Sequence, residues 1–363
     1  MKYECLGEQF IHAVEQVSKA RSKSNQTAHL QDIYISLEDH ILTLRATNLE
    51  IICEKSISVK GIHNGEAIIK GDILVKVVST LKNKTKALTC EVIEGVFVIS
   101  SGKDVLEIKT TPQEDFPTLP NEGEEILTLS QDQFSTNIRE VLFCVASTEI
   151  KPEIASVYLY TSNNELISVG TDSYRLAEKR TTLKDNKQLN ILIPGRILSD
   201  TLAILEGDEG EVIISKKDGT LTFTKQNLIV CIQTTQGQFP DYKQLFPKEQ
   251  TTVVTILKDD LTKALTATSL FTENYTPLTC QVENKTLTLQ TKNETLGSAT
   301  QIINIQQEGV DIQANYNNRY FLDVIPHLAG KNITLSFTTP NRPITIKSVE
   351  DTTFTYLLMP VNR

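Results

Sequence analysis

Acidic, hydroxyl and basic side chains occur together at one place in the chain where they could support catalysis. Asp172, Tyr174 and Arg175 lie within four residues and resemble an acid–base cluster, and five histidines are available. The usual catalytic signatures are absent from the sequence. It has no HExxH, no GxSxG and no phosphate-binding loop, and SGKDVLE at 101–107 lacks the required glycine spacing. We therefore expect a protein that is not an enzyme.

The six cysteines are scattered and do not form a recognisable site. None belongs to a CxxC pair, and none has a histidine nearby at metal-ligand spacing. The N-terminus MKYECLGEQF has no apolar signal region, so nothing indicates export. We expect reduced core thiols, no metal and no cofactor. The cysteines are Cys5, Cys53, Cys90, Cys144, Cys231 and Cys280.

Basic side chains gather in two stretches near the N-terminus, where they could contact phosphate groups. Residues 9–24 have a net charge of +2 and residues 72–86 have +3, although the whole chain has −9. Residues 133–148 and 196–208 show no such excess. The first third of the chain is therefore favoured for loose phosphate contacts. The alternative is that these lysines belong to ordinary solvated helix faces.

A repeated motif indicates how the elements that carry these residues are organised. Phe116-Pro117 and Phe239-Pro240 each follow a strand-like run and precede a second proline. A chain of 363 residues with this spacing divides into three units of about 121 residues. The third unit ends at Met359-Pro360. The Phe-Pro motif is therefore interpreted as the end of a repeat.

Each unit is predicted to hold two amphipathic helices, because apolar residues recur at helical spacing. Pro326 falls inside the last of these stripes and weakens that prediction. The first-helix stripes are Phe10, Ala13, Val14 and Val17; Phe134, Ile138, Val141, Leu142 and Val145; and Leu261, Ala264 and Leu265. The second-helix stripes are Leu74, Val77, Val78 and Leu81; Leu198, Leu202 and Leu205; and Phe321, Ile325 and Leu328.

Strands with alternating polarity follow each helix. After the first helix of each unit they flank turns at Glu38-Asp39, Ser162-Asn163-Asn164 and Asn284-Lys285, and a final strand pair closes each unit. This order predicts an α+β fold in which helices cover one face of each sheet. The expected domains are residues 1–124, 125–248 and 249–363.

Short motifs along the whole chain are similar to those of a known family. They are ATNLEI at 46–51, EDFPTLP at 114–120, KPEIASVYLY at 151–160, TDSYRLA at 171–177, LIPGRIL at 192–198, QFPDYKQLFP at 238–247 and the C-terminal YLLMPVNR. In this order they resemble the bacterial DNA polymerase III beta subunit family, the replicative sliding clamps.

The resemblance implies three clamp domains per chain and a head-to-tail homodimeric ring. Helices would line the hole, sheets would lie outside, and duplex DNA would pass through without being read by sequence. The implied function is that of a processivity factor. The alternative function is a protein–protein scaffold of repeated domains without a DNA role.

The resemblance also implies a cleft between the second and third domains that binds short peptides of partner proteins through apolar anchors. The chain differs from many relatives at Ser173-Tyr174, Gln244 and Asn362, which bears on peptide preference. The residues carried over to the cleft are Ile154, Thr171, Ser173, Tyr174, Arg175, Leu176, Pro240, Leu245, Tyr275, Asn317, Tyr320, Pro343, Met359 and Pro360.

Candidate DNA contacts combine the basic stretches with one position taken from the resemblance, Lys151. The implied partners are duplex DNA, a second copy of the chain, the polymerase III catalytic subunit, the clamp loader, and other polymerases and repair proteins. No apolar run approaches the ~18–20 residues that span a bilayer. The resemblance implies a bacterial cytoplasmic, nucleoid-associated protein. The candidate contacts are Arg21, Lys23, Lys76, Lys82, Lys84 and Lys151.

Overall fold

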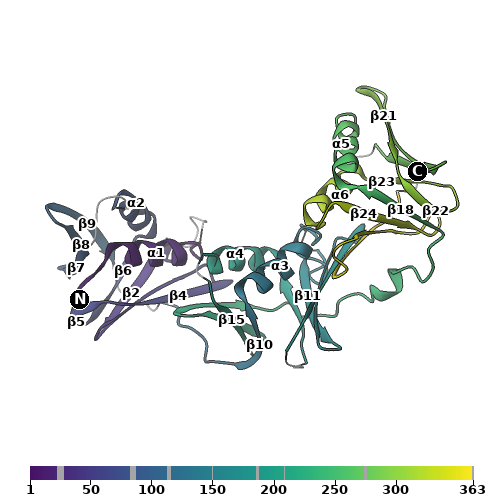
Figure 1. Cartoon of the computed structure of the whole chain (residues 1–363). Coiled ribbons are helices and arrows are strands. Elements are labelled where there is room, and N and C mark those ends of the chain that lie inside the picture. The colour runs from purple at the N-terminus through teal and green to yellow at the C-terminus, as the bar shows by residue number, and fades with distance from the viewer. Residues whose placement is uncertain are drawn as a thin grey trace. The chain divides into compact units, whose positions relative to one another are not determined.

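A computed structural model describes most of the chain (Figure 1). Its two compact units are residues 1–135 with 196–234, and residues 136–195 with 235–363. No helix in the described part is long and apolar enough to cross a membrane. The described residues are 1–22, 28–81, 87–112, 116–148, 150–184, 188–207, 209–273 and 276–361.

The three predicted repeats are confirmed by the order of the elements. Within each repeat, a strand and a helix precede three strands, and this series occurs twice. The first and third repeats have one additional short strand between the two series. The first repeat contains β1 (Lys2–Leu6), α1 (Gly7–Ser18), a 3₁₀ turn (Ala28–Gln31), β2 (Ile33–Glu38), β3 (Ile41–Thr47), β4 (Ile51–Ser58), β5 (Lys60–His63), β6 (Gly65–Ile69), α2 (Gly71–Leu81), β7 (Ala87–Ile93), β8 (Val96–Ser101) and β9 (Asp104–Thr111).

The later repeats follow the same plan. The second contains β10 (Glu124–Ser130), α3 (Gln131–Leu142), β11 (Ser156–Ser162), β12 (Glu165–Thr171), β13 (Arg175–Thr182), β14 (Asn190–Pro194), α4 (Gly195–Leu205), β15 (Glu211–Lys217), β16 (Thr220–Lys225) and β17 (Leu228–Gln233). The third contains β18 (Thr252–Leu257), α5 (Lys258–Ser269), β19 (Leu278–Glu283), β20 (Thr286–Asn293), β21 (Gly297–Asn304), β22 (Gln306–Gly309), β23 (Ile312–Tyr316), α6 (Asn318–Val324), β24 (Asn332–Phe337), β25 (Ile344–Ser348) and β26 (Phe354–Leu358). Further 3₁₀ turns span Lys243–Leu245 and Ile325–His327.

Three details correct the prediction. Each closing strand pair is a set of three strands, and a strand that periodicity did not reveal precedes every helix. The last helical stripe is divided, because α6 ends at Val324 and Pro326 lies in a separate 3₁₀ turn. Proline lacks the amide hydrogen that would continue the helix, which explains the break.

The predicted hairpin turns are confirmed by their backbone angles. Asn163 and Asn164 have φ of 52° and 60°, and Asn284 and Lys285 have 51° and 60°. Two successive residues with positive φ form the tight turn that matches the twist of antiparallel strands. Asp39 likewise has φ of 53° between β2 and β3.

The sheets do not follow the repeat boundaries. In the first unit, β4 of the first repeat pairs with β17 of the second, within a sheet of thirteen described strands. In the second unit, β13 pairs with β26 of the third repeat, within a sheet of nine described strands. A further four-stranded sheet in that unit has the order β21-β20-β19-β23. The predicted domain limits at 124/125 and 248/249 remain a prediction.

Apolar helix faces and inward strand residues form the cores. Phe10, Val14 and Val17 of α1 are fully buried, as are Leu74 and Val78 of α2, so the predicted stripes face the sheet. Each such side chain contributes roughly 1.5–3 kcal/mol through removal from water. All six cysteines are buried and unpaired.

Candidate functional site

The turn between β12 and β13 is held by its own side chains. The hydroxyl of Thr171 donates to the Arg175 carbonyl at 2.6 Å and accepts from the Ser173 amide at 3.1 Å. Asp172 Oδ1 accepts from the amides of Tyr174 and Arg175 at 2.9 and 3.0 Å. Ser173 has φ of 78°. This closed turn leaves Tyr174 projecting at its tip, with 64% of its surface exposed.

Arg175 joins this turn to two other elements of the same unit. Its Nε donates to Asp172 Oδ2 at 2.9 Å, its Nη1 to Asp323 Oδ2 of α6 at 2.6 Å, and its Nη2 to the Phe143 carbonyl at 2.9 Å. The guanidinium also lies over the Tyr320 ring at 4.3 Å. Arg175 therefore acts as a structural tie at the site.

The charge on Arg175 is stable. Burial alone would lower the pKa of Arg175, but interactions with Cys144, Tyr356, Asp323 and Asp172 raise that pKa above its ordinary value. A charged guanidinium held by two carboxylates has much of its charge neutralised within the protein.

The C-terminal segment runs beside the tip of the turn. The amide of Met359 donates to the Tyr174 carbonyl at 2.9 Å, and the amide of Val361 donates to the Asn315 carbonyl at 2.8 Å. Met359 and Pro360 remain partly exposed. Pro343 is buried and directly precedes β25, whose Ile344 is paired with Leu358. These contacts bring Tyr174, Arg175, Tyr320 and Met359 together.

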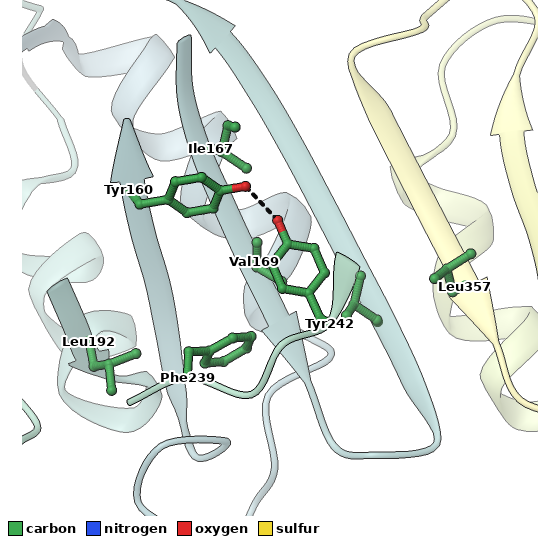
Figure 2. Packing of buried hydrophobic residues seen from close by; sticks show 8 residues of the cluster. Tyr160, Ile167, Val169, Leu192, Phe239, Tyr242 and Leu357 are labelled. Carbon is green, nitrogen blue, oxygen red and sulfur yellow. Dashed lines mark hydrogen bonds between the residues drawn. The ribbon is translucent and has the colours of Figure 1, made fainter. Parts of the chain in front are cut away.

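The second Phe-Pro motif packs on the same strands. Figure 2 shows Phe239 and Tyr242 beside Tyr160 and Val169, in a buried cluster that also contains Leu176, Ile167, Leu192 and Leu357. Tyr242 donates to Glu178 Oε2 at 2.6 Å, and its hydroxyl lies 2.7 Å from that of Tyr160 (Figure 2). Burial, followed by the Glu178 charge, raises the pKa of Tyr242 well above its ordinary value. The motif thus holds residues 239–242 against the strands that carry the site.

The remaining predicted cleft residues differ in their surroundings. Leu176 is 2% exposed and belongs to the core, whereas Pro240 and Leu245 are exposed on the packed motif. Asn317 precedes α6, and its Oδ1 accepts from the Arg319 amide at 3.0 Å. Ile154 lies in the turn after α3, where its carbonyl accepts from Ala146. Tyr275 and Asn362 lie outside the described residues.

Three family models together match almost the whole chain. They describe the N-terminal domain of the DNA polymerase III beta subunit at residues 1–120, its central domain at 128–241 and its C-terminal domain at 243–362. The chain belongs to the DNA polymerase III beta subunit family. Its function is that of a sliding clamp in DNA replication.

Relatives and solved structures agree with this family. The chain is 25% identical to the beta sliding clamp of Streptococcus pneumoniae over 97% of both chains, and 26% identical to that of Treponema pallidum over 99% of both. The beta subunit structure from Streptococcus pyogenes matches with a TM-score of 0.94 at 21% identity over 100% of both chains. The Bacillus subtilis sliding clamp matches with 0.93 at 23% identity, over 100% of this chain and 99% of that one.

The candidate DNA contacts of this beta subunit lie in unlike environments. Arg21 donates to the Gln31 carbonyl at 3.0 Å and to Asp72 Oδ1 at 2.8 Å, so it ties the end of α1 to the start of α2. Lys76 is exposed on α2, and Lys151 is exposed in the turn after α3. Lys23, Lys82 and Lys84 lie outside the described residues.

Sequence reasoning missed the residues that hydrogen-bond Arg175 and Tyr242 and so hold the site in place. Asp323 and Phe143 lie 148 and 32 positions from Arg175, and no sequence motif marks either residue. A signal was present for Glu178, because Glu54 occupies the same place in the first repeat, 124 positions earlier.

Proposed function

We propose that two copies of the chain close head to tail into a ring around duplex DNA, as a non-catalytic accessory subunit that holds partner proteins on the DNA. The observation that carries this proposal is a pair of sheet edges, one in the first repeat and one in the third, that keep apolar side chains exposed.

The first edge is the part of β9 at residues 104–109, although the strand as a whole lies between β6 and β8 in the sheet order. It pairs along its length with β8, whereas its pairing with β6 involves only Thr110 and Thr111 among the described strands. Val105 on β9 and Ile73 on α2 are exposed. An edge strand with exposed apolar neighbours favours pairing with another strand.

The second edge is β21, at the end of the four-stranded sheet. Among the described strands it pairs only with β20. Ile302 on β21 and Leu270 after α5 are among the most exposed apolar side chains, at 69% and 72%. Two different edges that meet form a heterologous interface, which yields a closed ring when the rotation between copies closes.

The DNA-facing surface is proposed to be the helices, with loose and sequence-independent phosphate contacts. Lys76 supports this proposal, because it is a basic residue exposed on α2. Such contacts would weaken as salt rises, since they depend on counterion release.

Partner proteins are proposed to bind through short peptides at the site around Tyr174 and Met359. A partly exposed methionine, an exposed tyrosine and exposed Pro240 and Leu245 offer the adaptable apolar surface that such peptides need. The partners would be the polymerase III catalytic subunit, the clamp loader, and other polymerases and repair proteins. The protein would act in the bacterial cytoplasm, on the nucleoid.

Retention on DNA tests this proposal. The full chain, loaded onto DNA, should remain on circular duplex and slide off linear duplex. Sedimentation should give about twice the mass of the 40.6 kDa chain. Ile302→Asp should produce monomers and abolish retention, because it places a charge in the apolar contact.

Val349→Asp provides the matched control. Like Ile302, Val349 is an exposed aliphatic residue of the third repeat, but it follows β25 and lies outside the β21 edge. It should leave the mass and the retention unchanged. Equal retention on circular and linear DNA, or a dimer that survives Ile302→Asp, would contradict the ring.

A further inference from the structure

A stacked pair of rings joins the end of α3 to the helical segment that contains α6. His327 is the last residue of the 3₁₀ turn Ile325–His327 that follows α6. Its ring centroid lies 4.0 Å from that of Phe143, and the two ring planes are 7° apart. Both side chains are partly buried. The imidazole of His327 can gain a charge near neutral pH, whereas the phenyl ring of Phe143 cannot.

Phe143 also contacts Arg175, so the stack adjoins the site proposed for partner peptides. The Arg175 guanidinium lies over the Phe143 ring at 5.7 Å, and its Nη2 donates to the Phe143 carbonyl at 2.9 Å. The Nη1 atom of Arg175 donates to Asp323 Oδ2 at 2.6 Å. Asp323 precedes His327 by four residues and interacts with the charge of the imidazole. We call Phe143, Arg175, Asp323 and His327 the Arg175 cluster.

The charges around His327 have opposing effects on its protonation. Burial lowers the pKa of His327 below its ordinary value, Asp323 acts in the opposite direction, and Lys258 at the start of α5 acts in the same direction as burial. Arg175 places a further positive charge beside the phenyl ring on which the imidazole stacks. The imidazole is therefore neutral at pH 7.5 in the intact cluster.

The other ionisable groups beside the Arg175 cluster keep their charge states as the pH falls. Burial raises the pKa of Cys144, which follows α3, and of Tyr356 on β26 well above their ordinary values, so both remain protonated. Asp172 is bound to Arg175 Nε. Phe354 of β26, which also lies beside His327, carries no charge. Within the cluster, His327 is thus the group that titrates near pH 6.5.

We propose that His327 makes the partner-peptide site sensitive to pH. A neutral His327 stacks on Phe143 and leaves Asp323 to Arg175. A protonated His327 competes for Asp323, so Arg175 loses part of its support and the turn that presents Tyr174 is no longer held in place. The inference rests on the proposed function of this site and concerns its regulation.

The direction of the effect follows from the coupling between protonation and structure. Because burial lowers the pKa of His327, a proton binds more readily to an arrangement in which the imidazole is exposed or paired with Asp323. Falling pH therefore increases the population of the loosened arrangement. The intact cluster is fully populated above about pH 6.5, the usual pKa of histidine, and is progressively lost below it.

Peptide titration of the full-length protein at several pH values tests the inference. The probe is a fluorescent apolar-anchor peptide with blocked ends and no ionisable side chain, so that only the protein changes its charge. Between pH 7.5 and pH 5.5, at constant ionic strength, its affinity should fall about fivefold. Hydrogen exchange of α6, corrected for the intrinsic effect of pH, should rise over the same range. Exchange of α4, the corresponding helix of the second repeat, should not rise.

Two substitutions at position 327 fix the charge in opposite states. His327→Phe keeps an aromatic ring against Phe143 but cannot titrate, so it should bind the peptide normally at pH 7.5 and equally well at pH 5.5. His327→Lys carries a positive charge at both pH values. It should bind about fivefold more weakly than the unaltered protein at pH 7.5, with little further change at pH 5.5.

His12→Phe is the matched control, because His12 lies on α1 in the first compact unit. It should retain the full pH dependence of the unaltered protein. Glu140 on α3 is another acid-sensitive group, since burial raises its pKa and it pairs with Lys179. A pH dependence of the same size in His327→Phe would assign the effect to a group other than His327 and overturn the inference.

The two measurements separate this inference from the proposed function. If no peptide binds the unaltered protein at pH 7.5, the peptide site is wrong, and hydrogen exchange of α6 alone decides the role of His327. If the peptide binds with the same affinity at both pH values, the inference is wrong and the peptide site stands.

Discussion

The same turn is built twice in this protein, at residues 47–51 of the first unit and 171–175 of the second. In both, a threonine hydroxyl donates to the carbonyl four residues later and accepts from the amide two residues later. In both, the side-chain oxygen of Asn48 or Asp172 accepts from the amides two and three residues later. The middle residue of each turn has positive φ, 75° at Leu49 and 78° at Ser173. The backbone frames of the two turns are equivalent.

The surroundings of the two frames are also related. Phe116 of the first Phe-Pro motif stacks on Tyr34 at 5.7 Å, and Phe239 of the second stacks on Tyr158 at 4.9 Å. In each unit, the end of a repeat is therefore fastened to the sheet that carries the turn. The repeated sequence motifs have a shared structural role.

The two turns differ in the side chain at their fifth position. In the first turn this position is Ile51, and the preceding Glu50 forms an exposed ion pair in which Arg196 Nη2 contacts both carboxylate oxygens. In the second turn it is Arg175, which binds Asp172, Asp323 and Phe143 in a half-buried setting. One frame thus supports a surface ion pair and the other supports the proposed peptide site.

The largest expected effect distinguishes the two ion-pair arrangements. Arg175→Ala should lower the free energy of unfolding by about 3 kcal/mol, because it leaves two carboxylates short of a partner in a mostly desolvated place. Arg196→Ala should cost less than about 1 kcal/mol, since its pair with Glu50 is exposed. Chemical denaturation measures both. Equal losses would show that the two turns are energetically alike.

A change beside the second turn should affect binding more than folding. Met359→Ala should weaken an apolar-anchor peptide by at least about tenfold with a near-normal thermal midpoint, because Met359 is partly exposed. Leu49→Ala, at the tip of the first turn, should leave the affinity unchanged. Leu176→Ala should instead lower the midpoint, since Leu176 is a core residue whose loss leaves a cavity. Normal peptide affinity in Met359→Ala would show that Met359 does not belong to the peptide site.

The shared frame predicts matched losses of stability. Thr47→Val and Thr171→Val each delete a hydroxyl that makes two hydrogen bonds, and each should cost about 1–2 kcal/mol. Only Thr171→Val should also reduce peptide affinity, because only the second turn presents Tyr174. A loss of peptide affinity in both variants would show that the change in binding does not arise at the second turn.

The smallest expected effect concerns the backbone. Glycine tolerates positive φ at little steric cost, so Leu49→Gly and Ser173→Gly should each raise the free energy of unfolding by about 0.5 kcal/mol. Calorimetry on both variants measures it. A lower free energy of unfolding in either variant would mean that the side chain of Leu49 or Ser173 makes stabilising contacts although it is exposed.

Local patterns predicted most of the helices and turns, because these depend on neighbours in sequence. The stripe of Leu198, Leu202 and Leu205 and the turn at Asn163-Asn164 are examples. The strands before each helix were missed, since stretches such as Lys2–Leu6 are too short for their alternation to stand out. The stripe through Pro326 was read as one helix although two elements share it.

The interior of the site was not predictable in the same way. The bond from Tyr242 to Glu178 joins residues 64 positions apart, and that from Arg175 to Asp323 joins residues 148 apart. Such pairs depend on which strands become neighbours. The cleft residues Tyr174 and Met359 came from family resemblance, and the structure brings their main chains into direct contact.

The division of the middle repeat between two sheets limits how the protein can be dissected. A fragment cut after residue 124 would leave β4 without β17, and its inward residues Ile51 and Cys53 would border a bare edge. A fragment that starts at residue 249 would likewise expose β26, which normally pairs with β13. Uncovered apolar strands of this kind associate with one another. Recombinant single repeats should therefore aggregate, and gene fusions that exchange one repeat need compensating changes along the strands at the new joint.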